Sequence, residues 1–588
     1  MKKTIAYYLL MCLTLSAQSQ YYLRGCIRDE KNNALQYGRI YLHTSKNSTQ
    51  SGYDGSFGIS CKQLYDSVTI SLNGFEPTTF YIKTDVFVSV VLKPTALTLL
   101  KSKPKLISFT KDAKENERFN PLISDETYFK LVENEFVKTE KFPNTGFSLN
   151  VNKAAYSNVR RFINMKSKVP PDAVRIEEMI NYFNLDYEEP AADDVFNIRS
   201  SVTDCPWNST SKLLFLKLSA KKIDLGKIPP GNFVFLIDVS GSMDMPNRLP
   251  LLKEAFQLFV KNLRPIDKVS IVTYGGVVGT WLEPTFGNEK DKINNSLELL
   301  TAAGDTPGES AILAAYKLAT ATFIKDGNNR VIIATDGDFN VGQTSEKALD
   351  ELISKQRQSG IYLTCLGVGM GNFKDSKLQT LAKRGNGNYA YLDNLHEAEK
   401  VLVNELTETL YAVADNAFIN VAFDDSQVSS YRLIGFDNKR EAVQDAGSEL
   451  DGGEIGSGST TLTIFEIVPT TNCNIKEGLG TLVLKYHKTG DAMFKTQQVK
   501  YDISAAAQEG AKPIEKFAAA VAMYGLKLKE SPHLNNTSWN DVKNTALGAV
   551  DENNFLQADF LKLLNKSIDI YEPVKKKKKA KKRRTAIK

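Results

Sequence analysis

The feature that most constrains this chain is a regular alternation of strand-like and helical segments between residues 229 and 413. The strand-like runs are apolar along most of their length, and the segments between them repeat apolar residues every three or four positions. This combination indicates a doubly wound, mainly parallel sheet with helices on both faces. The strands are predicted at Phe233–Val239, Val269–Tyr274, Thr280–Leu282, Arg330–Thr335, Tyr362–Gly367 and Tyr389–Leu392. The helices are predicted at 248–263, 309–324, 345–358, 375–384 and 395–412.

Polar residues gather at the ends of two of these strands. Asp238, Ser240 and Ser242 end the first strand, and Asp336 follows the fourth. Ligands of such sheets bind beyond the carboxyl ends of the strands, where the strand order reverses, and a strand order of 3-2-1-4-5 makes these two strands neighbours. Carboxylate and hydroxyl oxygens suit a small hard cation such as Mg²⁺ or Mn²⁺. With few direct carboxylates, the ion stays electrophilic enough to accept an Asp or Glu carboxylate from a partner protein.

The Asp-x-Ser-x-Ser pattern at a strand end resembles the metal-ion-dependent adhesion motif of von Willebrand factor A domains, which have a Rossmann-like fold. The resemblance implies a threonine in a loop before a long helix, which Thr306 matches, and a final aspartate, which Asp336 matches in "IATDGDFN". The implied metal ligands are Asp238, Ser240, Ser242, Thr306 and Asp336.

Two positions depart from the pattern of the resembled family. Its motif loop usually reads Gly-Ser-Thr, whereas this chain has Gly304-Asp305-Thr306. Asp305 is therefore predicted to modulate the site, because its carboxylate either tightens metal binding or repels an acidic partner. Family members usually carry acidic residues where this chain has Asn150 and Asn152, which argues against a charge-based role for that segment here.

The resemblance extends beyond the central domain, over about residues 127 to 570. The segments "AAYSNVRRFINMKSKVPPDAVRIEEMINYF", "TDCPWN", "NRVIIATDGDFNVG" and "YRLIGFDNK" are similar to those of the bacterial YfbK-like proteins. This resemblance implies an exported or envelope-associated protein whose biochemical role is poorly defined.

The N-terminus predicts export. Lys2 and Lys3 precede a short apolar run, Ile5–Leu15, and the small residues Ser16 and Ala17 follow it, as in a secretory signal. The final compartment is the periplasm, the outer envelope or the medium. Residues 20–95 then predict short strands separated by turns, typical of a small β-sandwich. They resemble the transthyretin-like carboxypeptidase-regulatory domain through Gly25, Asp29, Leu35, Gly52, Asp54, Gly55, Phe57 and Asn73–Phe75.

The regions that flank the central domain predict an insertion. Strand-like segments at 196–220 and 416–503 lie on its two sides in the sequence, so the α/β domain is expected to project from a β-sandwich. Helices are predicted at Ala154–Met165, Ala173–Phe183, Phe517–Leu528 and Phe555–Leu564. The predicted organisation is a signal peptide (1–19), a regulatory-like sandwich (20–95), a linker (96–126), an N-terminal family region (127–228), the von Willebrand factor A domain (229–413), a β-sandwich region (414–510), a helical region (511–572) and a disordered Lys-rich tail (573–588).

After removal of the signal, five cysteines remain, an odd number that leaves at least one free thiol. Cys365 lies in an apolar run and is predicted to be a buried thiol. Cys26 and Cys61 fall in strand-like segments of one small domain, so a disulfide between them is left open.

The charge distribution argues against nucleic acid as a partner. The formal net charge is +6, but the last fourteen residues hold ten basic side chains and no acidic ones, so the rest of the chain carries −4. The tail is interpreted as a solubilising end, with electrostatic contact to acidic lipid or envelope polymer as the alternative.

Catalytic chemistry is not expected. Ser240 has Asp238 where the hydrolase elbow motif needs glycine, and the four histidines are scattered. Ser240 also stands where an Asp-x-Asp phosphatase would place its second aspartate. The glycines at 367–371 end the fifth strand, so they predict a tight connection rather than a dinucleotide loop. Three hypotheses remain: a metal-dependent binding or adhesion module, a structural scaffold of the envelope, and an assembly- or chaperone-associated factor.

Overall fold

The chain forms two compact units, residues 1–107 and 108–588, and each is considered by itself. The predicted signal peptide, Asp305, Thr306, the Lys-rich tail and all of the predicted linker except Glu126 lie outside the described residues. The computed structural model describes residues 21–30, 32–95, 126–183, 185–224, 226, 228–275, 277–304, 308–337, 343–371, 373–436, 453–489, 496–504, 512–534 and 536–572.

The first unit is the predicted β-sandwich. One sheet has the order β4-β1-β7 and the other β3-β2-β5-β6, and the two share one core that includes Leu23, Ile40, Val68 and Leu92. In β5 every second residue is buried, because alternate side chains of a strand point to opposite faces. The strands are β1 Tyr21–Asp29, β2 Arg39–Leu42, β3 Asn47–Gln50, β4 Ser56–Cys61, β5 Tyr65–Ser71, β6 Thr78–Lys83 and β7 Phe87–Leu92.

No disulfide joins Cys26 and Cys61, the cysteines of the β-sandwich. Cys61 pairs in register with Tyr21, and Cys26 pairs with Ser56, so the two thiols lie five residues apart along neighbouring strands. Cys26 and Cys61 are both free. The disulfide between Cys26 and Cys61 that the sequence left open is therefore not formed in the structure.

The α/β domain is built on a six-stranded sheet of order β14-β13-β12-β15-β16-β17. All its pairings are parallel except that of the edge strand β14. Counted along the chain, the strand order is 3-2-1-4-5-6, which meets the condition under which the first and fourth strands are neighbours. Every residue of the central strand β12 is buried, as expected for a strand covered on both faces. Its strands are β12 Gly231–Asp238, β13 Lys268–Tyr274, β14 Gly279–Phe286, β15 Asn328–Thr335, β16 Ile361–Gly367 and β17 Tyr389–Tyr391.

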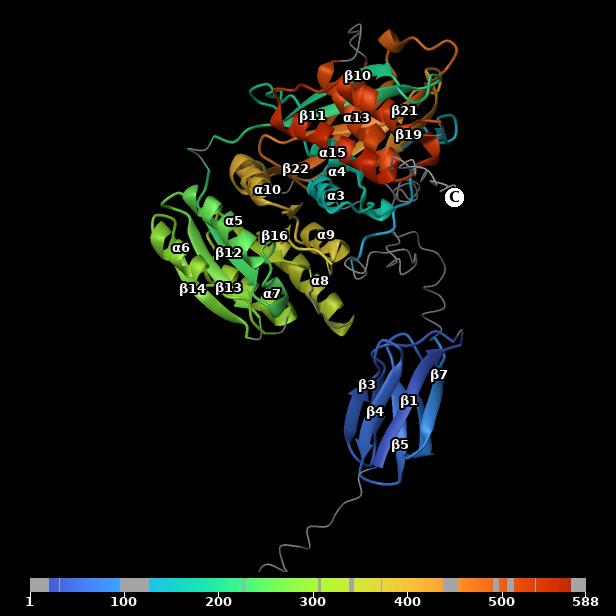
Figure 1. The fold of residues 1–588 in the computed structure, drawn as a ribbon, viewed down its shortest axis with the longest axis vertical. Coiled ribbons are helices and arrows are strands. Elements are labelled where there is room, and N and C mark those ends of the chain that lie inside the picture. Colours follow the sequence, from blue (N-terminus) through green and yellow to red (C-terminus); the bar gives the residue numbers. More distant parts are fainter. Residues whose placement is uncertain are drawn as a thin grey trace, which may run out of the picture. The chain divides into compact units, whose positions relative to one another are not determined.

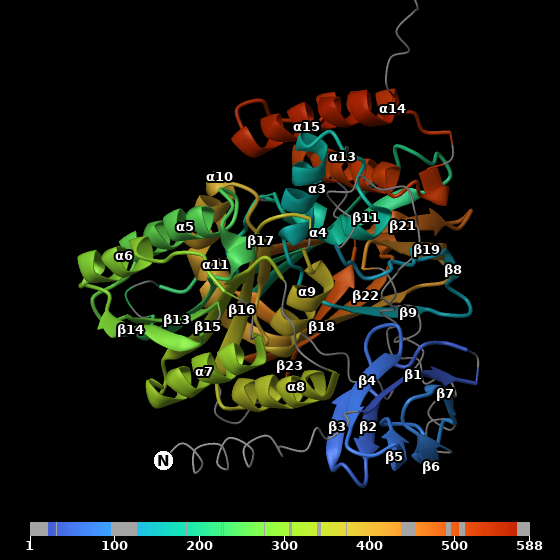
Figure 2. The same cartoon turned by 60° about the horizontal axis from the view of Figure 1, so that its bottom comes forward.

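Helices cover the two faces of this sheet, with α5 and α6 on one side and α7 and α8 on the other (Figure 2). Cys365 lies in the core on the second side and is fully buried, as predicted; burial raises the pKa of its thiol well above the usual value. The helices are α5 Leu249–Lys261, α6 Lys290–Glu298, α7 Gly308–Ala321, α8 Gln343–Gln358 and α9 Asp375–Arg384.

The predicted single helix at 395–412 is wrong in detail. The segment is divided into α10 Leu395–Glu399, a π-helical turn η4 Lys400–Asn404, and α11 Leu406–Leu410. At the break, Lys400 and Glu405 are both buried and pair with each other, a contact that helical periodicity does not reveal.

The remaining strands form the base from which the α/β domain projects. Strands before the domain pair with strands after it: β11 with β21, and β9 with β18. The predicted insertion in a β-sandwich is therefore confirmed, although β8 and β9 were not among the predicted strands. The strands are β8 Val137–Lys138, β9 Asn144–Ser148, β10 Phe196–Asp204, β11 Lys212–Ala220, β18 Ala412–Phe423, β19 Val428–Ile434, β20 Gly453–Gly456, β21 Thr460–Pro469, β22 Gly480–Lys488 and β23 Thr496–Ile503.

Helices pack over one sheet of the base, with α13 and α15 beside β11 and β21 (Figure 1). Asn152, just before α3, accepts a hydrogen bond from the backbone N–H of Tyr389 in β17 at 2.9 Å, so it links the base to the α/β sheet. Among the described residues, no helix is long and apolar enough to cross a membrane. The helices are α3 Ala154–Asn164, α4 Ile176–Asn181, α13 Pro513–Leu528, α14 Trp539–Leu547 and α15 Phe555–Tyr571.

Candidate metal centre

The strand β12, which lies where the strand order reverses, ends in the buried carboxylate of Asp238. Asp238 stands beside Thr335 at the end of β15, since Ile237 pairs with Ala334. The hydroxyl of Thr335 donates to Asp238 Oδ2 at 2.8 Å, and the hydroxyl of Tyr274 donates to the same oxygen at 3.2 Å. Asp238 is therefore held in one orientation at the carboxyl end of the sheet.

The motif loop that follows β12 brings two hydroxyls together. The backbone N–H of Ser240 donates to Asp238 Oδ1 at 2.9 Å, and Ser240 Oγ lies 3.1 Å from Ser242 Oγ. Gly241 N–H donates to the carbonyl of Gly304 at 3.0 Å, so the loop that leads toward Thr306 is joined to the motif loop. The structure thus brings together Asp238, Ser240 and Ser242.

Arg248 is also part of this site, although it is not among the residues predicted from the sequence. Its Nη1 donates to Asp336 Oδ2 at 2.8 Å and to the carbonyl of Ser242, and its Nη2 donates to the carbonyl of Met370 at 2.7 Å. Gly369 has a positive φ of 80°, and a Cβ there would lie 2.6 Å from Arg248 Nε. The glycine run at 367–371 was a signal for this contact: it is a tight connection, as predicted, and it also makes room for the guanidinium.

The electrostatics of the site favour a bound cation. The pKa of Asp238 is raised to about 6, mainly by burial and also by the negative charge of Asp336, while the hydrogen bonds from Ser240 and Thr335 act in the opposite direction. A nearby positive charge stabilises the ionised form of a carboxylate. A divalent cation therefore has a larger effect on Asp238 here than it would have on an exposed carboxylate.

The donor set fits a small hard cation. Neighbouring ligands of an octahedral ion with bonds of about 2.1 Å lie roughly 3 Å apart, and the hydroxyls of Ser240 and Ser242 are 3.1 Å apart. All side-chain donors are oxygen atoms. Among the described residues, no group of three or more His, Cys, Asp or Glu could hold a metal, so the fit depends on the two serine hydroxyls together with Asp238 and Asp336.

We expect Arg248→Met to strengthen binding of a divalent cation. Arg248 competes for Asp336 and adds a positive charge beside the site, so its removal should raise Mn²⁺ affinity by roughly tenfold. Isothermal titration of the full-length protein with Mn²⁺ measures this. Weaker binding in the variant would show that Arg248 serves mainly to keep Asp336 in place.

This arrangement of sheet and site defines a class of protein, one that carries a von Willebrand factor type A domain, and residues 233–338 match that family. Residues 122–215 match a family described as von Willebrand factor, and residues 408–570 match the C-terminal family of the uncharacterized protein YfbK. The chain is 36% identical to the uncharacterized protein YfbK of Escherichia coli strain K12 over 460 residues, which cover 74% of this chain and 80% of that protein. The chain therefore belongs to the YfbK family.

More distant relatives share only a part of the chain. Inter alpha-trypsin inhibitor heavy chain 4 of Mus musculus is 24% identical over 201 residues, which cover 33% of this chain and 21% of that protein. A solved von Willebrand factor type A protein from Catenulispora acidiphila is 14% identical, with a TM-score of 0.38, and the match covers 65% of this chain and 91% of that one. BatB from Bacteroides thetaiotaomicron is 21% identical, with a TM-score of 0.27, over 30% of this chain and 98% of that one. The family assignment rests on YfbK and on the matched families.

Proposed function

We propose that this protein is an exported, non-enzymatic binding module that captures a partner protein through Mg²⁺ or Mn²⁺. Domains of this type mediate protein–protein interactions, and that coarser function is the starting point. The observation that carries the proposal is the convergence of Asp238, Asp336 and the paired hydroxyls of Ser240 and Ser242 at the switch point of the sheet. Export is supported by the signal-like pattern at residues 1–19.

The side chains divide the work at this site. Ser240, Ser242 and Thr306 would hold the ion, with Asp238 and Asp336 supplying negative charge around it. A bound ion of this kind supplies an electrophilic position for an external carboxylate. Thr335 and Tyr274 keep Asp238 oriented by hydrogen bonds. Within the described residues, the site supplies two carboxylates, those of Asp238 and Asp336, so a carboxylate from an Asp or Glu of the partner is still attracted.

The test is the stability of the full-length protein with and without metal. At a hundred times its dissociation constant, a ligand that binds only the native state stabilises it by about 2.7 kcal/mol. We expect Mg²⁺ to raise the unfolding temperature of the α/β domain, EDTA to reverse the effect, and Asp238→Ala to abolish it. Differential scanning calorimetry measures all three, and an equal response to Mg²⁺ in the variant would contradict the proposal.

A scaffold role is the second candidate, and buried ion pairs favour it. Arg330 in β15 pairs with Glu454 of the base at 2.8 Å, and Arg160 in α3 pairs with Asp393 at 2.6 Å. These contacts fix the α/β domain to the base. Calorimetry that finds no effect of Mg²⁺ on the wild-type protein would favour the scaffold.

A further inference from the structure

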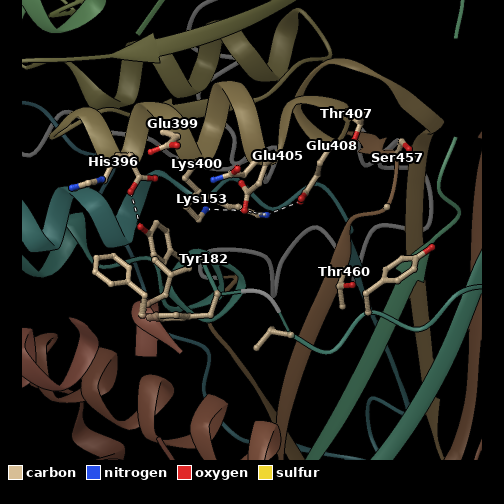
Figure 3. Close-up of a pocket in the computed structure, with 18 of the residues that line it drawn as sticks. Lys153, Tyr182, His396, Glu399, Lys400, Glu405, Thr407, Glu408, Ser457 and Thr460 are labelled. Carbon is tan, nitrogen blue, oxygen red and sulfur yellow. Dashed lines mark hydrogen bonds and ion pairs between the residues drawn. The ribbon is translucent and has the colours of Figure 1, made fainter. Parts of the chain in front are cut away.

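A second candidate site lies where the last helical segment of the α/β domain meets the base. This junction pocket has a volume of about 690 Å³, within the range of small-ligand sites. In Figure 3, Glu399, Lys400, Glu405 and Thr407 come from the helical segment above the pocket, and Thr460 lies across from them. None of the predicted metal ligands lines it.

A row of alternating charges forms the deep wall of the pocket (Figure 3). Lys400 Nζ lies 2.9 Å from Glu405 Oε1, and Lys153 Nζ lies 3.3 Å from that oxygen and 2.6 Å from Glu408. Lys400 Nζ also lies 4.2 Å from the ring centroid of Tyr182. Yet neither Lys400 Nζ nor Glu405 Oε1 makes an aligned hydrogen bond within the described part of the chain, although the side chains of both are only 8% exposed. A buried ammonium and a buried carboxylate therefore keep hydrogen-bonding capacity beside an open cavity.

The π-helical turn explains why these two groups face the same way. Glu405 N–H donates to the carbonyl of Lys400 at 2.8 Å, a bond that spans five residues. In an α-helix, residues five apart point in different directions, whereas a turn closed over five residues brings them onto one face. Such turns are rare and occur often at functional sites.

The mouth of the pocket adds unpaired charges of both signs and an aromatic surface. Lys222 is exposed and has no carboxylate partner among the described residues, and its Nζ lies 4.1 Å from the ring centroid of Tyr187. Glu399 is also exposed and has no cationic partner within the same described ranges. Phe555, the first residue of α15, is 66% exposed. The pocket therefore offers a positive group, a negative group and an apolar surface.

We propose that the junction pocket binds a short peptide with free termini. Lys222 matches a terminal carboxylate, Glu399 matches a terminal ammonium, and Phe555 covers an apolar side chain. A neutral ligand such as an oligosaccharide would displace water from these charged side chains without supplying opposite charges. The desolvation of the charges would then be unfavourable. A ligand with one sign of charge would leave half of the pocket unmatched.

The probe is a mixture of tripeptides with phenylalanine at the centre, incubated with the full-length protein and separated by rapid gel filtration. Mass spectrometry then measures the retained peptides. We expect retention of the free mixture, and at least tenfold lower retention of the same mixture after acetylation and amidation. Lys222→Glu and Phe555→Ser should each reduce retention, whereas Leu547→Ser, at a residue that is 53% exposed on α14, should not.

Lys222, Phe555 and Leu547 are exposed, so their variants should fold. Unfolding temperatures equal to that of the wild type would verify this. Retention should also persist in EDTA and in Asp238→Ala, so it does not depend on the candidate metal centre. No retention by the wild-type protein, equal retention of the blocked mixture, or tighter binding of chitotriose than of free peptide would each overturn the proposal. Loss of retention in EDTA would assign the peptide to the metal centre instead.

Discussion

Arg175→Met should lower the free energy of unfolding of the second unit by about 3–5 kcal/mol, the loss measured when one partner of a buried pair is removed. Arg175 lies just before α4 and is 4% exposed. Its Nε pairs with Glu178 at 2.6 Å, and its Nη1 pairs with Asp375 of the α/β domain at 2.7 Å. Methionine fills similar space but leaves two carboxylates buried without a cation. Denaturant unfolding, checked by calorimetry, measures the loss.

The matched control is Arg199→Met. Arg199 pairs with Glu188 at 3.1 Å, but its side chain is 61% exposed, and exposed pairs contribute about 0–1 kcal/mol. A loss below about 1 kcal/mol for Arg175→Met would mean that water enters and solvates Glu178 and Asp375. The ion pairs of Arg175 with Glu178 and Asp375 would then stabilise the contact between the base and the α/β domain less than their distances indicate.

The pattern of the sequence was sufficient to place the two carboxylates of the candidate metal centre. Asp238 and Asp336 follow strongly apolar strands, and the switch-point rule makes those strands neighbours, as the pairing of β12 with β15 confirms. Arg248 was not predictable in this way. It reaches the site from the turn before α5 and is held by Met370 and Asp336. The glycine run at 367–371 signals close packing at this place, but it does not identify the arginine that packs there.

Elements with few buried residues were also not predicted, because their sequences carry too weak a hydrophobic pattern. In α6 only Ile293 and Leu297 are buried, and two apolar residues one turn apart are too weak a periodic signal. The strand β8 has only two residues and exists because β19 offers a free edge. The break at Lys400–Asn404 depends on Glu405 and Lys153, which come from different domains and cannot be paired from periodicity.

Asp238→Asn should have opposite effects in EDTA and in Mg²⁺. Burial raises the folded-state pKa of Asp238 to about 6, above the ordinary 3.8, so the folded state holds this proton more tightly than the unfolded state does. The contribution of this proton to stability should therefore be complete below about pH 4 and be lost as the pH rises through 6, a loss of about 3 kcal/mol. Asparagine removes the charge, so in EDTA at pH 7 the variant should be more stable than the wild type, with a flatter pH profile between 4 and 7.

Added Mg²⁺ should reverse that order, because the ionised Asp238 of the wild type then has a counter-charge that asparagine cannot use. Calorimetry of both proteins at pH 4.5 and pH 7, each with EDTA and with saturating Mg²⁺, separates the two effects. If the variant is less stable than the wild type in EDTA at pH 7, Arg248 already neutralises the site and the buried charge of Asp238 carries no penalty. The reversal on adding metal tests the site independently of any partner, since a rigid turn without metal affinity would show the same difference between the two proteins in both solutions.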